Sequence, residues 1–107
     1  MTCPFNTMAM AIALNTHRVL ELLERTTPDT THRQALKERI IQREETGFKK
    51  YGRTMDRRDY TLADWHLHLL EELMDAAQYA MRAGDTELAN HLLDNAYRIQ
   101  KRLDDET

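Results

Sequence analysis

Four polar residues within segment 66–79 fall along one line of a helix. At 100° per residue, His68, Glu71, Glu72 and Asp75 share one stripe of the helix surface, here called the polar stripe. Its three carboxylates repel one another unless something positive lies over them. Glu72 and Asp75, three residues apart, point the same way from adjacent turns. They could therefore share one divalent cation such as Mg²⁺ or Mn²⁺, which prefers oxygen ligands.

The preceding predicted helix must supply the remaining ligands of such a cation. Glu44 lies near the middle of the apolar arc of that helix, where a charge without a partner is unfavourable. Glu45 follows it, and Glu38 lies one to two turns earlier on the side of Glu45. One helical hairpin could bring these acids to Glu72. Which of Glu44 and Glu45 completes the site stays open.

A strongly basic segment lies between the two acidic helices. Between Phe48 and Arg58 the chain has one acid, Asp56, and five basic residues: Lys49, Lys50, Arg53, Arg57 and Arg58. Beside a metal site, positive side chains are what a polyphosphate substrate requires, because they neutralise the phosphate oxygens that the metal leaves uncovered. Tyr51 and Trp65 flank the segment and could stack on a base, although aromatic residues at such positions more often pack in a core.

A plainer interpretation must be weighed against this one. Acidic residues on a helix usually form a solvated face, a basic loop can serve solubility alone, and a single histidine such as His68 is more often a hydrogen-bonded structural residue than a ligand. Three features agree on a site: the acid in the apolar arc, the basic segment and the histidine within the polar stripe.

Composition restricts the class of protein. With three Gly, two Pro and 31% charged residues in 107, the chain favours helices over strands. A formal charge of −3 argues against a nucleic-acid binder or a protein of anionic membranes. One cysteine allows no intrachain disulfide, and the apolar run 8–14 is too short for a membrane span and lacks the features of a signal peptide. We expect a cytoplasmic protein without a membrane or nucleic-acid partner.

The periodicity predicts an all-α fold, an antiparallel four-helix bundle in a single domain over 1–107. Asn6 or Thr7 is expected to begin the first helix, and Thr30 or Thr31 the second. Thr61 with Asp64 three residues later forms a pattern like a capping box at the start of the third helix, and Asp85 can cap the fourth. Gly47 and Gly84 are expected to end the second and third. The predicted helices cover about 7–25, 31–46, 62–83 and 86–103, with a basic loop at 47–60. The apolar residues expected to face inward are Leu67, Leu69, Leu70, Leu73, Met74, Ala77, Ala80 and Met81 on the third helix, and Leu88, Leu92, Leu93, Ala96, Ile99 and Leu103 on the fourth.

Segment 43–83, REETGFKKYGRTMDRRDYTLADWHLHLLEELMDAAQYAMRA, resembles a group of small phage and prophage proteins related to the MazG-like all-α nucleoside triphosphate pyrophosphohydrolases. The shared pattern is R-x-x-x-G-x-x-K-Y-G, then D-x-x-x-x-D-W, then H-x-x-E-E-x-x-D-x-x-x-Y. The matching positions are Arg43, Gly47, Lys50, Tyr51, Gly52, Asp59, Asp64, Trp65, His68, Glu71, Glu72, Asp75 and Tyr79. The resemblance covers about two fifths of the chain.

The resemblance implies hydrolysis of a (deoxy)nucleoside triphosphate to its monophosphate and pyrophosphate, with Mg²⁺ or Mn²⁺. It implies metal ligands among Glu44, Glu45, Glu72 and Asp75, and a water positioned or deprotonated by Glu71 or Glu45. The resemblance further implies that the substrate is contacted by Lys49, Lys50, Tyr51, Arg53 and His68. It also implies a homodimer or homotetramer, in the host cytoplasm if the gene belongs to a phage.

The sequence departs from the family in one half of the metal motif. Glu72 and Asp75 match E-x-x-D, but the E-x-x-E of the preceding helix is absent, and its nearest forms are Ile41-x-x-Glu44 and Gln42-x-x-Glu45. This departure leaves two possibilities. In the first, Glu44 or Glu45 completes the metal site with help from Glu38 or Glu71. In the second, the metal site is degraded, and the protein is a non-catalytic helical interaction or nucleotide-binding protein. The residues do not indicate a base preference. We take a purine deoxynucleotide such as dGTP or dATP as the expected substrate.

Overall fold

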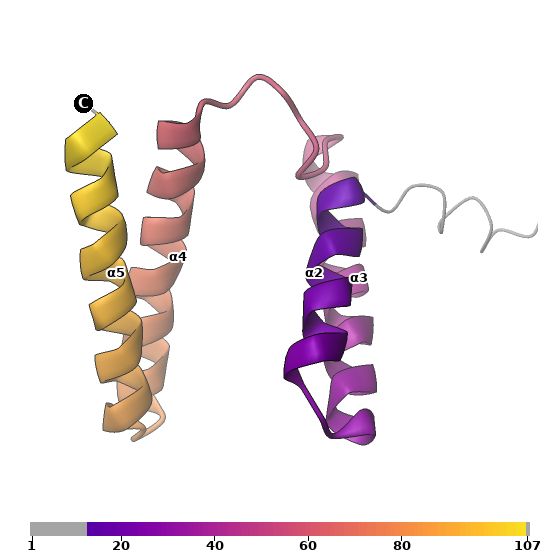
Figure 1. Cartoon of the computed structure of the whole chain (residues 1–107), viewed down its shortest axis with the longest axis horizontal. Helices are drawn as coiled ribbons and strands as arrows, with labels where there is room; N and C mark the ends of the chain where they lie inside the picture. Colours follow the sequence, from indigo (N-terminus) through magenta and orange to yellow (C-terminus); the bar gives the residue numbers. More distant parts are fainter. Residues whose placement is uncertain (1–12, 107) are drawn as a thin grey trace, which may run out of the picture. The chain divides into compact units, whose positions relative to one another are not determined.

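The computed structural model describes residues 13–106, and all regular elements within that range are helices. They are α2 (Leu14–Thr26), α3 (Thr30–Tyr51), α4 (Leu62–Arg82) and α5 (Thr86–Glu106), as Figure 1 shows. The chain divides into two compact units, one up to Arg57 and one from Arg58. The expected all-α class with four helices is confirmed for the described range. The bundle arrangement of the two units, a single domain and oligomerisation stay predictions.

The unit from Arg58 is a hairpin of α4 and α5 joined at Gly84 (Figure 1). Its buried and half-buried residues recur every three or four positions, so one face of each helix lies against the other. The core contains Leu70, Ala96 and Ile99, with Leu73 and Leu103 packed against it. The residues of this seam are Ala63, His66, Leu70, Leu73, Ala77 and Ala80 on α4, and Ala89, Leu92, Ala96, Ile99 and Leu103 on α5.

Several apolar residues expected to be buried lie on the flanks of this seam and are exposed. Side chains that are 44% to 54% exposed include Leu67, Leu69, Met74 and Met81 on α4, and Leu88 and Leu93 on α5. The apolar arc of α4 is wider than the stripe that one neighbouring helix can cover. The inward face predicted for all of these residues is therefore wrong for the flanking ones in the described hairpin.

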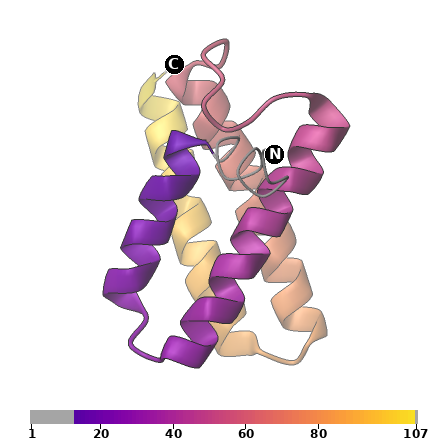
Figure 2. The ribbon, with the colours of Figure 1, turned by 90° about the vertical axis from the view of Figure 1, so that its right-hand side faces the viewer.

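The other unit is a hairpin of α2 and α3, which run antiparallel in Figure 2. Its core is small: Ala13 and Thr16 are buried, and Ile40 and Ile41 are half-buried. Asp29 caps α3 by accepting a 3.0 Å hydrogen bond from the N–H of His32, so the expected cap at Thr30 or Thr31 is wrong by one or two residues.

The predicted end of the second helix at Gly47 is also wrong. Helix α3 continues through Gly47 to Tyr51, and Gly52 ends it in the left-handed conformation at φ 69°, with its N–H donating to the carbonyl of Phe48 at 2.7 Å. A glycine inside a helix costs only about 1 kcal/mol, which neighbouring turns can offset. The connection to α4 therefore begins at Gly52, and residues 47–51 of the predicted basic loop, Lys49 and Lys50 among them, are helical.

The other helix bounds follow the predicted pattern more closely. Residues 7–12 of the predicted first helix and its candidate caps Asn6 and Thr7 lie outside the described residues. Within the described range, Ala13 is extended, at φ −63° and ψ 149°, and α2 begins at Leu14. Helix α4 agrees with 62–83 to one residue, and α5 runs three residues beyond 103. None of the helices within 13–106 is both long and apolar enough to span a membrane.

Candidate functional site

The start of α4 is fixed by two sets of local contacts. The N–H of Thr61 donates to Oδ2 of Asp64 at 2.8 Å, and the N–H of Asp64 donates to the Thr61 hydroxyl at 3.1 Å, which confirms the expected capping box. The ring of Tyr60, directly before the cap, packs on Trp65 with centroids 4.8 Å apart. This contact is a hydrophobic staple, in which the residue before the cap packs against the fourth helical residue.

The capping box also changes the charge state of its acid. Hydrogen bonds from the Thr61 N–H, and then from the Thr61 hydroxyl, lower the pKa of Asp64 below its ordinary value, and the nearby charge of His68 adds to this effect. Asp64 therefore remains ionised at neutral pH, one turn before His68. It extends the line of carboxylates on this face of α4.

The polar stripe lies on the face of α4 opposite the seam with α5, and all four of its residues are exposed. Nδ1 of His68 is 3.8 Å from Oε1 of Glu71. Glu72 and Asp75 have no ion-pair partner among the described residues. Glu72 and Asp75, on adjacent turns of α4, therefore carry negative charges that no Lys or Arg of residues 13–106 neutralises.

Glu44 is held by the start of α2. The N–H of Ala13 donates a 2.7 Å hydrogen bond to its Oε1, while its Oε2 is buried without a hydrogen-bond partner among the described residues. Its half-buried position agrees with its place in the apolar arc. The next acid, Glu45, instead pairs with Lys49 at 3.1 Å, and Lys49 is 74% exposed. Such a pair within one helix is worth only about 0.3–0.5 kcal/mol, so Glu45 can exchange it for another cation.

Asp56 is a residue whose role sequence reasoning missed. Its carboxylate accepts hydrogen bonds from the N–H groups of Leu14 at 2.6 Å and Asn15 at 2.9 Å. With Glu44, it satisfies three backbone donors at the start of α2, where the helix dipole favours negative charge. The one signal in the sequence was an acid standing alone in a basic segment.

The basic residues predicted to bind substrate lie at the end of α3 and just beyond it. Lys49 and Lys50 occupy its last turn, where cations interact favourably with the helix dipole. Nζ of Lys50 lies 5.2 Å from the ring centroid of Tyr51, a cation–π contact. Arg53 follows the helix in the connection. Lys49, Lys50 and Tyr51 are exposed, so they remain accessible to an anionic ligand.

The predicted site residues fall into two sets, one in each unit. The set on α3 and its end contains Glu44, Glu45, Lys49, Lys50, Tyr51 and Arg53; the set on α4 contains His68, Glu71, Glu72 and Asp75. No three His, Cys, Asp or Glu side chains in the described part of the chain are grouped so that they could hold a metal ion. The donor chemistry nevertheless fits Mg²⁺ or Mn²⁺: the acids offer hard oxygen atoms, and the buried Oε2 of Glu44 lacks a partner.

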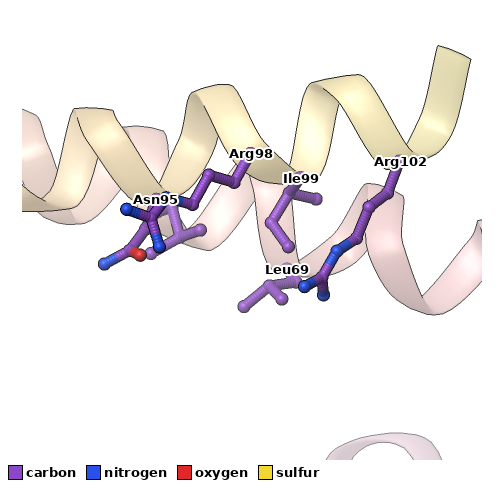
Figure 3. A pocket seen from close by; sticks show the side chains of 6 residues that line it. Leu69, Asn95, Arg98, Ile99 and Arg102 are labelled. Carbon is purple, nitrogen blue, oxygen red and sulfur yellow. The ribbon is translucent and has the colours of Figure 1, made fainter.

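A shallow groove of about 260 Å³ lies between α4 and α5 (Figure 3). Its apolar lining is Leu69, Leu73 and Ile99, and its polar lining is Asn95, Arg98 and Arg102. Arg98 is paired with Asp94 at 3.3 Å. None of the predicted site residues lines this groove, so it is distinct from the polar stripe.

The candidate functional residues therefore form two groups, each described within its own unit: the polar stripe on α4, and the acids and cations at the end of α3. Comparison with known proteins found no matching family model, curated protein or solved structure.

Proposed function

We propose that the protein is a metal-dependent nucleoside triphosphate pyrophosphohydrolase, which hydrolyses a (deoxy)nucleoside triphosphate to the monophosphate and pyrophosphate. The observation that carries the proposal is the buried, unpartnered Oε2 of Glu44. A buried acceptor without a partner costs about 1–3 kcal/mol, and more when it is charged. A divalent cation offsets that cost, and the Ala13 N–H already fixes the other oxygen of the same carboxylate.

The polar stripe supports the same proposal from the other unit. Glu72 and Asp75 present two carboxylates on one face without an ion-pair partner in the described chain, so a cation would relieve their repulsion. We assign Glu72, Asp75 and one of Glu44 or Glu45 to hold Mg²⁺ or Mn²⁺. When bound, the ion supplies positive charge to the phosphate oxygens.

The remaining residues have roles in the proposed reaction. Glu71 or Glu45 positions a water molecule and accepts its proton as the oxygen adds to the α-phosphorus. The bond from that phosphorus to the α–β bridging oxygen breaks, and pyrophosphate leaves. Lys49, Lys50 and Arg53 neutralise the phosphate oxygens, as cations do in phosphoryl transfer. The α-phosphorus gains one oxygen from water, so the products are the nucleoside monophosphate and pyrophosphate.

A homodimer or homotetramer is part of the proposal. The exposed flank residues of the α4–α5 hairpin, such as Leu69, Met74 and Leu93, are of the kind that a partner subunit covers. The cytoplasm suits a protein with a single cysteine and a nucleotide substrate.

The second candidate is a non-catalytic helical interaction or nucleotide-binding protein. The observation that favours it is that both acids of α3 already have structural contacts: Glu44 with the Ala13 N–H, and Glu45 with Lys49. Together with the missing E-x-x-E, these contacts are what a degraded metal site would retain. This candidate predicts that Glu72→Gln leaves binding and stability intact.

A pyrophosphate-release assay on the full chain tests the proposal. Each of the common NTPs and dNTPs is incubated with the protein and Mn²⁺ or Mg²⁺, and the same is done with Glu72→Gln and Glu87→Gln. Glu87 is the matched control, because it is an acid on α5 whose side chain is 89% exposed. We expect release by the wild type and Glu87→Gln, and at least a hundredfold loss in Glu72→Gln. Release from none of the nucleotides would contradict the proposal.

A further inference from the structure

An aromatic cluster lies beside the polar stripe at the start of α4. The rings of Tyr60 and His68 are stacked nearly parallel, at 4° and 5.1 Å between centroids, and Tyr60 also packs on Trp65 at 58° and 4.8 Å. We call these three residues the aromatic shelf. Because the staple to Trp65 fixes Tyr60, and Tyr60 covers one face of His68, the imidazole plane has a defined orientation.

The stapling contact alone does not require His68. A hydrophobic staple is complete with Tyr60 and Trp65, and the side chain of His68 remains 55% exposed while stacked on Tyr60. A histidine placed there adds a flat, polar ring within a row of carboxylates, between Asp64 and Glu71. The ring of His68 therefore provides an aromatic face that the staple at the start of α4 does not use.

The distance along α4 suits a nucleotide. With a rise of about 1.5 Å per residue, Glu72 lies about 6 Å and Asp75 about 10 Å beyond His68 along the helix axis. This is the length scale that separates the base of a nucleoside triphosphate from its phosphates. A base on His68 and phosphates at Glu72 and Asp75 could therefore belong to one molecule.

We propose that the aromatic shelf binds the nucleobase of the substrate, which stacks on the face of His68 opposite Tyr60, and that purines bind more tightly than pyrimidines because they offer more ring area. The inference rests on the proposed function and deepens it: the substrate is a nucleotide, not an inorganic polyphosphate. Stacking of a base on an aromatic side chain is worth about 1–3 kcal/mol, which corresponds to about 5- to 150-fold in affinity.

Trp65 makes the test simple, because it is the single tryptophan of the chain and belongs to the shelf. The full chain is titrated with deoxyadenosine and deoxycytidine to millimolar concentration in the presence of EDTA, and tryptophan fluorescence is followed. Nucleosides lack phosphates and EDTA removes metal, so this measurement does not depend on catalysis. We expect a saturable change with deoxyadenosine at lower concentration than with deoxycytidine.

Two substitutions of His68 and one control complete the experiment. His68→Phe keeps a flat ring and should bind deoxyadenosine, whereas His68→Leu should weaken binding at least fivefold. His91→Leu is the control, since that histidine lies on α5 with a side chain 68% exposed, and should bind as the wild type. No fluorescence change with either nucleoside, equal binding by His68→Leu, or tighter binding of deoxycytidine would overturn the inference.

The pyrophosphate-release assay separates this inference from the proposed function. If triphosphates are hydrolysed but His68→Leu leaves KM unchanged, the shelf is only a staple and the enzymatic proposal stands. If deoxyadenosine binds in the expected order but no nucleotide is hydrolysed, the shelf is a base-binding surface and the enzymatic proposal fails.

Discussion

The N–H of Ala13 donates a 2.7 Å hydrogen bond to the carboxylate of Glu44, 31 residues further along the chain. Asp56 accepts from the next two N–H groups, those of Leu14 and Asn15. The start of α2 is therefore capped by acids distant in sequence, because Ala13 itself has no capping side chain. Glu44 is also a proposed metal ligand, so the same carboxylate would stabilise the start of α2 and bind the metal ion.

Removing the Glu44 cap should destabilise the α2–α3 hairpin. We expect Glu44→Ala to lower the free energy of unfolding by about 1–2 kcal/mol, because one N–H at the start of α2 loses its acceptor. Glu44→Gln keeps an acceptor oxygen and should lose less. Chemical denaturation followed by circular dichroism measures both. Glu24→Ala, an exposed acid on α2, is the control. Equal stability of Glu44→Ala and the control would show that the contact contributes nothing.

Acidification should weaken the start of α4. The Thr61 N–H lowers the pKa of Asp64 in the folded protein. Its contribution to stability is therefore present above the unfolded pKa, about 4, and is lost as the pH falls through the lower folded value. We expect Asp64→Asn to be less stable than the wild type at pH 6, with the difference shrinking below about pH 4. Denaturation series at several pH values measure this, and a pH-independent difference would contradict it.

The far end of the α4–α5 hairpin is closed by a contact between His66 and Glu106. Nδ1 of His66 lies 2.6 Å from Oε1 of Glu106, and their side chains are only 16% and 22% exposed. We expect Glu106→Ala to cost about 1 kcal/mol of stability, because a half-buried imidazole nitrogen loses its partner. Asp105→Ala, at the exposed neighbouring position, should change stability by less than about 0.5 kcal/mol. Indistinguishable melting temperatures for the two variants would refute this role.

Mn²⁺ should stabilise the folded protein through the carboxylates of both units. At a free concentration 100 times the Kd, the linkage is worth about 2.7 kcal/mol, which thermal melting detects. We expect the shift to disappear in Glu72→Gln and to shrink in Glu44→Gln, while Glu87→Gln retains it. A shift of full size in Glu72→Gln would place the metal elsewhere in the protein.

Local signals in the sequence predicted the helices well where the capping residues are neighbours. The Thr61 and Asp64 capping box and the Asp85 cap of α5, which accepts from the Leu88 N–H at 3.0 Å, are both confirmed. Gly47 and Gly52 show the limit of this reasoning. Either glycine could end a helix, and Gly52 rather than Gly47 adopts the left-handed conformation, at φ 69°, that ends α3.

The candidate site was less accessible to prediction because its contacts join distant segments. The apolar arc placed Glu44 in a half-buried position, but nothing near Glu44 in sequence indicated Ala13 as its partner. The three-residue spacing of Glu72 and Asp75 fixed their shared face, since that follows from helix geometry alone. The sequence did not indicate a role for Tyr60. Tyr60 precedes the first residue of α4, so helical spacing could not place its ring against that of His68.

Phosphorus NMR of the products tests the central claim most directly. The full chain is incubated with dATP or dGTP and Mn²⁺, the metal is removed with EDTA before spectra are recorded, and Glu72→Gln is treated in parallel. We predict that the wild type converts the triphosphate into monophosphate and pyrophosphate in equal amounts, and that Glu72→Gln leaves it intact. Unchanged triphosphate with the wild type, or release of inorganic phosphate in place of pyrophosphate, would contradict the account.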